Sequence, residues 1–348
     1  MSVHPTARLE IDLNALAANY RALQARQPAA EIAPVVKADA YGLGAGRIAQ
    51  HLRLKGARTF FVARRDEGVA LRGHLGSGPV IYVLDGLDDP AAFAAHDLRP
   101  VLNSAAQVAL WAKGPALAAA LHIDTGMNRL GVRPDELGAL PQTPPFSLVM
   151  SHLACADEPD HPLNAKQLAA FRTAAASLPA APLSFANSAG AFLGPDYGFD
   201  LVRPGICLYG GGPFGAPHAE ISPVARLFGR VLQVRDLKPG ESVGYSATFE
   251  AQREMRLATI GVGYADGVLR HFGARGFAIV QGEKRSLIGR VSMDAFSLDI
   301  SGLDVAVDDW VELFGVHQPI DEVAAASGTV AYEWLTRIGP RVERHYFG

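Results

Sequence analysis

Eight apolar runs, separated by segments with helical periodicity, constrain the fold of this chain more than any other feature. The runs lie at residues 32–36, 60–63, 80–84, 99–102, 118–123, 147–152, 183–187 and 201–209. Helix-like segments at 48–54, 105–112 and 165–178 lie between them. Nearly continuous apolar strands that alternate with helices are typical of parallel sheets buried on both faces. Eight such repeats predict a (β/α)8 barrel, with a doubly wound sheet as the alternative.

The pattern changes after about residue 215. Apolar runs at 225–234, 255–263, 277–281 and 310–314 are separated by Pro and Gly, with few helical stretches, which predicts a mostly β domain. Residues 7–13 alternate like a strand that can pair into this domain, and Asn14 is placed to cap a helix that runs to about Leu23. We therefore expect a barrel over residues 11–215 and a mostly β domain formed by residues 1–10 and 216–348.

Composition excludes several classes of protein. The formal charge of the 348-residue chain is −3, which disfavours nucleic acid as a partner because nucleic acid selects a basic face. The first residues show no basic segment followed by an apolar run, so no secretory signal is expected. No uncharged apolar span reaches 18 residues, so no transmembrane helix is expected. Cys155 and Cys207 lie in apolar runs and are expected to be buried free thiols. These features predict a soluble cytoplasmic protein with no membrane partner and no metal.

Polar residues stand at the ends of five apolar runs. They are Lys37, Asp124-Thr125-Gly126, His152, Ser188 and Arg203-Pro204-Gly205. In a barrel the carboxyl ends of all strands open onto one face, where the chemistry takes place. Each residue alone has an ordinary interpretation, such as a solvated lysine, a core histidine or a helix cap. Their shared placement favours a functional site.

Lys37 is the most informative of these residues. It ends a buried run and precedes a loop with three glycines, after which a helical pattern begins near Arg47. A lysine at the tip of a buried strand can form a Schiff base, and the loop amides can hold an anionic group.

Motifs at these positions resemble those of the alanine racemases, pyridoxal phosphate enzymes with a fold-type III barrel followed by a β domain. In the barrel the motifs cover residues 36–42, 124–131 and 203–210, and in the β domain 243–245, 262–267 and 289–294. The resemblance runs from about Leu9 to Val342. Cofactor-binding relatives without catalytic activity lack the β domain, and decarboxylases that share the barrel have a different C-terminal pattern.

The resemblance implies pyridoxal 5'-phosphate as the cofactor and a role for each barrel residue. Lys37 would carry the cofactor as an internal aldimine and later act as a base. The phosphate would be held by two hydroxyls and two backbone amides, those of Tyr41, Ser188, Gly205 and Ile206.

Three further barrel residues are assigned in the same way. Arg203 would face the pyridine nitrogen and leave it unprotonated, because a guanidinium keeps its protons. This would weaken the cofactor as an electron sink and reduce side reactions such as transamination. Arg129 would donate to the phenolic oxygen of the cofactor and contact the substrate, and His152 would orient Arg203 or pack against the ring.

Racemisation explains the second domain, because a proton must leave one face of Cα and return on the other. Lys37 would serve one face, and Tyr245 resembles the second base. In the family this tyrosine comes from the partner subunit, which implies a homodimer with C2 symmetry. The amide of Met293 would bind the substrate carboxylate beside Asp294, and Tyr264 would narrow the entrance to favour a small side chain.

Two positions depart from the family pattern. Many members have a carbamylated lysine where this chain has His122, and its negative charge positions the arginine that corresponds to Arg129. A histidine cannot provide that carbamate, so another group must hold Arg129. Pro340 stands at about the place of a phosphate-binding tyrosine, which predicts a weaker hold on the cofactor or a wider entrance.

The predicted function is the interconversion of L- and D-alanine to supply D-alanine for peptidoglycan. The alternatives are a racemase for serine or for several amino acids, a decarboxylase with the same barrel, and a non-catalytic protein of pyridoxal phosphate homeostasis. A non-catalytic protein would not need the β domain with Tyr245 and Met293-Asp294.

Overall fold

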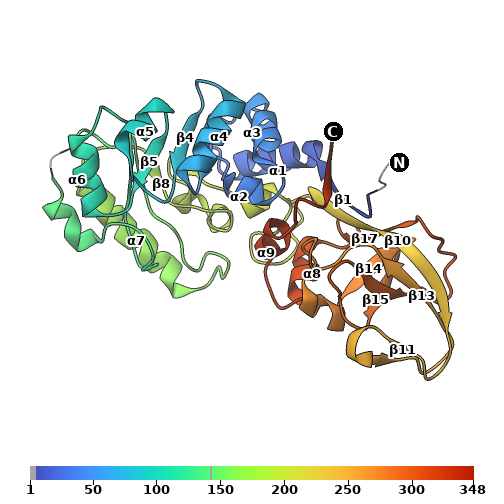
Figure 1. Cartoon of the computed structure of the whole chain (residues 1–348). Coiled ribbons are helices and arrows are strands. Elements are labelled where there is room, and N and C mark those ends of the chain that lie inside the picture. Colours follow the sequence, from blue (N-terminus) through green and yellow to red (C-terminus); the bar gives the residue numbers. More distant parts are fainter. Residues whose placement is uncertain (1–4, 142) are drawn as a thin grey trace. The chain divides into compact units, whose positions relative to one another are not determined.

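Strand pairing divides the chain into two units, each built on its own sheet (Figure 1). The computed structural model describes residues 5–141 and 143–348. One unit is Ala17–Leu208, and the other combines the described residues up to Leu16 with Tyr209–Gly348. The chain therefore passes from one unit to the other twice.

The Ala17–Leu208 unit contains an eight-stranded sheet in the order β2-β9-β8-β7-β6-β5-β4-β3. Its strands are β2 Glu31–Ile32, β3 Thr59–Val62, β4 Val80–Val83, β5 Arg99–Leu102, β6 Ala120–His122, β7 Leu148–Met150, β8 Leu183–Ser184 and β9 Leu201–Val202. Every pair is parallel. A parallel bridge between Val35 and Phe61 joins the two ends of this order. The sheet is a closed barrel, and the predicted (β/α)8 fold is confirmed.

Each of the eight predicted runs overlaps one strand, but most strands are shorter than the runs. The difference is largest for the run at 201–209, where only Leu201–Val202 is a strand and Ile206–Leu208 forms the 3-10 turn η4. The residues of this turn are as buried as the strand. An apolar run records burial, and burial continues beyond the strand end.

Helices and short turns flank the barrel strands along the chain. They are α1 Leu13–Arg26, α2 Lys37–Tyr41, α3 Ala45–Leu54, α4 Arg65–Leu75, α5 Pro90–Ala95, α6 Ala105–Lys113 and α7 Pro162–Ala176, with short turns η1 Pro134–Ala139, η2 Gly190–Phe192 and η3 Pro195–Tyr197. The prediction that Asn14 caps α1 was wrong. The Asp12 carboxylate accepts from the backbone amides of Asn14 and Ala15 at 2.9 and 3.0 Å, so Asp12 is the cap.

The second unit is mostly β. Its larger sheet has the order β13-β16-β15-β14-β17-β10-β1-β18, and β13 also pairs with β10. The strands are β1 Ala7–Asp12, β10 Ala225–Leu237, β13 Met255–Ile260, β14 Phe277–Val280, β15 Glu283–Ile288, β16 Phe296–Asp299, β17 Trp310–Phe314 and β18 Glu343–Phe347. Strand β1 pairs antiparallel with β10 and parallel with β18. Strands β11 Ser242–Val243 and β12 Phe249–Glu250 form a separate hairpin, and α8 Ile320–Ala326, α9 Ala331–Thr336, η5 Tyr245–Ala247 and η6 Arg270–Ala274 complete the unit.

Two observations bear on the predictions from composition. In the described part of the chain no helix is both long and apolar enough to cross a membrane. Cys155 and Cys207 are both free thiols, but only Cys207 is buried, whereas Cys155 is half-buried.

Candidate active site

The barrel places four of the predicted site residues beyond the carboxyl ends of its strands. Lys37 follows the Val35–Phe61 bridge, His152 follows β7, Ser188 follows β8 and Arg203 follows β9. Because all strands are parallel, these ends lie on one face of the barrel. The sequence therefore predicted correctly which end of the barrel gathers the polar groups.

Lys37 is half-buried at the first position of α2. Burial lowers its pKa, and the nearby Arg129 guanidinium lowers it further, whereas the carboxylates of Glu67 and Asp85 act in the opposite direction. A lysine with a lowered pKa has a larger fraction of neutral amine at neutral pH. Neutral amine is the form that attacks a carbonyl carbon and accepts a proton.

Two hydroxyls and a short turn form a cradle suited to an anion. The Ser188 hydroxyl accepts from the backbone amides of Gly205 at 2.9 Å and Cys207 at 3.3 Å, where η4 begins. The Tyr41 hydroxyl lies directly over Gly205, and a Cβ at that position would stand 2.1 Å from the phenolic oxygen. A side chain at this position would therefore displace the Tyr41 hydroxyl. Tyr41, Ser188, Gly205 and Ile206, predicted from the sequence to bind phosphate, are thus adjacent and buried.

Arg203 is a buried cation, with 4% of its surface exposed. Its guanidinium donates to the Ser184 hydroxyl, to the carbonyl oxygens of Ser151 at 2.6 Å and Phe185 at 3.5 Å, and to His152. All four acceptors are neutral groups. Burial lowers the pKa of Arg203 to about 9, so the group remains charged at neutral pH. A buried charge without a carboxylate is costly, and an anionic or electron-rich ligand would offset that cost.

The contact with Arg203 fixes the protonation of His152. An arginine can only donate, so His152 Nδ1, 3.3 Å from Nη2, accepts and the proton sits on Nε2. Burial lowers the pKa of His152 well below its usual value, and the neighbouring cations Arg203, Arg129 and Lys37 add to this. His152 is therefore neutral, and its position next to Arg203 is the one predicted.

His122 holds the opposite tautomer. Its Nδ1 lies 2.7 Å from Asn103 Oδ1, and Asn103 Nδ2 donates to the Leu84 carbonyl at 2.8 Å, which fixes the orientation of the amide. Since Asn103 Oδ1 can only accept, His122 Nδ1 donates and Nε2 keeps a lone pair. Burial and the Arg203 guanidinium lower the pKa of His122 to about 4. The sequence predicted neither the tautomer nor the role of Asn103.

Arg129 projects from an exposed loop. The Asp124 carboxylate shapes this loop by accepting from the amides of Gly126, Met127 and Asn128 at 2.9 to 3.1 Å. Arg129 itself is exposed, but its charge acts on Lys37, His122 and His152, as their lowered pKa values show. The loop thus brings Arg129 near the site.

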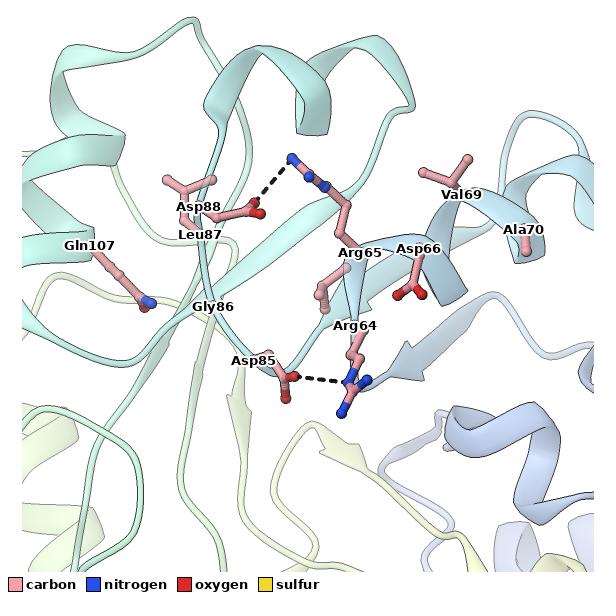
Figure 2. A pocket seen from close by; sticks show the side chains of 11 residues that line it. Arg64, Arg65, Asp66, Val69, Ala70, Asp85, Gly86, Leu87, Asp88 and Gln107 are labelled. Carbon is pink, nitrogen blue, oxygen red and sulfur yellow. Dashed lines mark ion pairs between the residues drawn. The ribbon is translucent and has the colours of Figure 1, made fainter. Parts of the chain in front are cut away.

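A separate pocket of about 680 Å³ opens beside α4, at the end of β4 (Figure 2). Figure 2 shows its two ion pairs, Arg64 with Asp85 at 3.9 Å and Arg65 with Asp88 at 3.2 Å. Gln107 closes the opposite wall. The residues that line this pocket differ from the predicted site residues, and four of its five charged side chains form ion pairs with one another. Asp85 connects it electrostatically to Lys37.

Tyr245 lies in the other unit, on the loop between β11 and β12. Its side chain is 72% exposed. The loop is shaped by three residues with positive φ, Gly244, Ser246 and Ala247, and Arg290 donates to the Ser246 hydroxyl at 3.2 Å. These contacts fix the loop while Tyr245 projects into solvent.

The remaining predicted residues of this unit lie together. Tyr264 donates its amide to the Ser292 carbonyl at 3.1 Å, and the next amide, of Ala265, donates to the Met293 carbonyl at 3.0 Å. Asp294 forms an ion pair with Arg341 at 2.8 Å. Arg341 follows Pro340 and also pairs with the buried Asp266 at 3.1 Å, so it joins the segment after Tyr264 to the segment after Met293. The sequence did not predict this arginine.

Comparison with known proteins decides the family. A model of the alanine racemase N-terminal domain matches residues 11–213, and one of the alanine racemase C-terminal domain matches residues 224–346. The chain belongs to the alanine racemase family. It is thus an isomerase of a family whose cofactor is pyridoxal phosphate.

Individual relatives of this family match over nearly their whole length. A protein of Agrobacterium fabrum named "Alanine racemase, catabolic" is 46% identical, over 98% of this chain and 92% of its own length. The alanine racemase of Rhodospirillum rubrum is also 46% identical, over 99% of this chain and 96% of its own length. The crystal structure of alanine racemase from Bartonella henselae with covalently bound pyridoxal phosphate has a TM-score of 0.93 and 40% identity, with 99% of this chain and 100% of that chain covered.

The barrel residues fit the family's cofactor. The cradle of Tyr41, Ser188 and Gly205 suits a phosphate, because it offers hydroxyls and backbone amides where a Cβ would leave no space. The buried Arg203, held by neutral acceptors, is suited to an electron-rich ring nitrogen. Lys37, with its lowered pKa, suits a carbonyl group.

The lowered pKa of His122 predicts a pH dependence of stability. A folded-state pKa of about 4, below the ordinary value of 6.5, means that the unfolded chain binds the proton more readily. The contribution of neutral His122 to the free energy of unfolding is then fully present above pH 6.5, and it is lost as the pH falls toward 4. His122→Gln removes this contribution, so wild type should lose about 2 kcal/mol more than the variant between pH 7 and pH 5.

Urea unfolding of both proteins without cofactor, at pH 7 and pH 5, measures the difference. Carboxylates and His152 titrate in both proteins and therefore cancel. Equal losses in the two proteins would show that His122 is not the group responsible.

Proposed function

We propose that the protein interconverts L- and D-alanine, with Lys37 and Tyr245 as the bases for the two faces of the substrate Cα. The observation that carries the proposal is the barrel site itself. It combines a lysine of lowered pKa, an anion cradle that includes Ser188 and Gly205, and a buried arginine with neutral partners. This combination matches the chemistry of a racemase that uses pyridoxal phosphate.

The barrel would hold the cofactor at three places. Lys37 would bind it covalently, and the hydroxyls of Tyr41 and Ser188, with the amides of Gly205 and Ile206, would bind its phosphate. Arg203 would donate to the ring nitrogen, and His152 would support Arg203. When bound, pyridoxal phosphate makes the Cα–H of an amino acid acidic enough for a side-chain base to remove the proton.

Arg203 would limit the chemistry to racemisation. A guanidinium at the ring nitrogen keeps that nitrogen unprotonated, because arginine does not release its proton at neutral pH. The pKa of Arg203, lowered to about 9, is still well above that of a pyridine nitrogen. The negative charge that develops on deprotonation then stays near Cα, which favours prompt return of the proton over side reactions.

Two bases divide the proton transfer. Lys37 would take the proton on one face as the neutral amine or return it as the ammonium, and Tyr245 would take it on the other face as the phenolate or return it as the phenol. Tyr245 is 72% exposed within its own chain, as expected for a side chain that completes the site of a second subunit. We therefore propose a homodimer with shared active sites.

Four further residues would hold the substrate. Arg129 and the Met293 amide would bind the carboxylate of the amino acid. Tyr264 and Asp294 would narrow the space for its side chain, and the ion pair with Arg341 holds Asp294 in place. A methyl group suits a narrow entrance, which favours alanine over larger amino acids.

The test is a chiral assay of purified protein with pyridoxal phosphate and L-alanine in deuterated water, with L-serine in parallel. Wild type is expected to form D-alanine with deuterium at Cα, faster than D-serine. Lys37→Ala and Tyr245→Phe should each lower the rate at least about 100-fold, because each removes one proton-transfer group. Tyr197→Phe, in η3 of the barrel unit, removes a hydroxyl outside the site and should keep the rate.

Each other outcome identifies a different error. Deuterium in L-alanine alone would contradict the two-base mechanism. Faster turnover of serine would make the enzyme a broader racemase. Carbon dioxide release would identify a decarboxylase. A protein that binds the cofactor but exchanges no proton would belong to the homeostasis class.

Mixing the two inactive variants tests the shared sites. If Tyr245 acts in the partner's site, a dimer of one Lys37→Ala and one Tyr245→Phe chain has one complete site. Random exchange of subunits should then restore about a quarter of wild-type activity, since half of the dimers are mixed and each has one working site of two. No recovery after denaturation and joint refolding would place both bases in the same chain.

We also propose that the D-alanine serves peptidoglycan synthesis. The similar Agrobacterium fabrum protein is named catabolic, whereas the Rhodospirillum rubrum protein is not, so the names leave the direction of flux open. Disruption of the gene should make growth dependent on added D-alanine. Growth without D-alanine, together with loss of growth on D-alanine as a carbon source, would show that the enzyme works in breakdown.

A further inference from the structure

The backbone that carries Lys37 has an unusual conformation. The four residues after it, Ala38, Asp39, Ala40 and Tyr41, have φ values of 51°, 54°, 52° and 58°. Each is in the left-handed helical region, which costs a residue with a Cβ about 1–2 kcal/mol. Such a turn persists only where surrounding contacts fix it. Those contacts therefore decide where the Lys37 amine points.

One of these contacts comes from Glu67, the third residue of α4. Its Oε1 accepts from the amide of Ala38, the first left-handed residue, at 2.7 Å. Its Oε2 accepts from the amides of Ala63 at 2.7 Å and Arg64 at 3.1 Å, where β3 ends and α4 begins. Hydrogen bonds to an ionised carboxylate are shorter and stronger than those between neutral groups. The carboxylate thus ties the strained turn to the adjacent strand of the barrel.

Both oxygens of the Glu67 carboxylate are needed in this arrangement. Both oxygens accept, and all three partners are backbone N–H groups, so the site accepts only a group with two acceptor atoms. A glutamine of the same size has one oxygen and one NH2 group. Its NH2 would face an N–H donor, either at Ala38 or at the Ala63–Arg64 corner, and one side would lose its acceptor.

We propose that Glu67 is a positioning residue for racemisation, whose carboxylate fixes the left-handed turn and thereby aims the Lys37 amine at the reacting carbon. Glu67 also places a negative charge near Lys37. The proposal rests on the proposed function for its effect on turnover. The effect on the backbone turn is independent of it, because the hydrogen bonds belong to the protein alone.

The test compares Glu67→Gln with Glu136→Gln. Glu136 is a matched control, because it is also the third residue of its helical turn and accepts from the backbone amide of Arg133 at 3.0 Å. It has the same local role in the same unit, and it makes no described hydrogen bond with residues 37–41. Glu67→Asp is the second variant, since it keeps the charge in the first turn of α4 but shortens the reach to Ala38.

Two measurements separate the effect on the turn from the effect on turnover. The first is amide hydrogen exchange of the peptide that covers residues 36–44, in protein without cofactor. Exchange should rise at least about 10-fold in both Glu67 variants and stay unchanged in Glu136→Gln, because Glu67 bonds this turn and Glu136 does not. Exchange in the α7 peptide, residues 162–176, should stay as in wild type and would reveal general unfolding.

The second measurement is the kinetics of the loaded enzyme with its circular dichroism in the visible band of the cofactor. The kcat of Glu67→Gln should fall about 10- to 100-fold while KM for alanine changes less than about 3-fold, since a misplaced amine affects reaction more than binding. The dichroism should weaken as the cofactor loses its fixed orientation.

The outcomes keep the two proposals apart. Unchanged exchange at residues 36–44 in the Glu67 variants would overturn the role of Glu67, whatever the activity. Faster exchange with an unchanged kcat would show that the turn does not position Lys37. An inactive wild type whose Glu67 variants still show faster exchange would overturn the proposed function and leave the backbone role in place.

Discussion

Closure of the parallel sheet at Val35 and Phe61 is the contact on which the rest of the barrel site depends. Val36 N donates to the Phe61 carbonyl at 2.8 Å, and Phe61 N donates to the Pro34 carbonyl at 2.9 Å. These bonds join β2 and β3, the two ends of the strand order, and so abolish the open edges of the sheet. A closed ring brings residues from the first and last strands face to face. Without closure the turn after Lys37, which follows β2, and Glu67, which follows β3, would lie at opposite edges.

The groups around Arg203 are cations and neutral histidines. Arg203, Arg129 and Lys37 are cationic or potentially cationic, and the two histidines between them are kept neutral by burial and by these cations. The histidines differ in tautomer because their partners differ. An arginine makes His152 an acceptor at Nδ1, and an asparagine carbonyl makes His122 a donor there. The surroundings of Arg203 therefore suit a ligand that brings negative charge.

The sequence predicted the barrel because eight buried runs leave a direct signal. It predicted where the polar residues gather, because strand ends in a parallel barrel share a face. Strand lengths were not predictable, since η4 is as apolar as the strand before it. Glu67 and Asn103 were missed for another reason. Glu67 accepts only from backbone amides, and Asn103 donates to a backbone carbonyl and fixes the tautomer of His122. A single sequence contains no pattern for such contacts. The left-handed turn after Lys37 was missed as well, because Ala and Asp carry no signal for it.

The pairing of β1 has a consequence for the order in which the chain folds. This strand lies between β10 and β18 in the sheet, and both partners are separated from it by most of the chain. Ala17–Leu208, in contrast, closes its barrel with residues from within one continuous stretch. During synthesis on the ribosome, the barrel can therefore complete its sheet before the partner strands of β1 have been made. Loop-closure entropy makes the late pairing slow, and one edge of β1 stays unpaired until β18 has been synthesised.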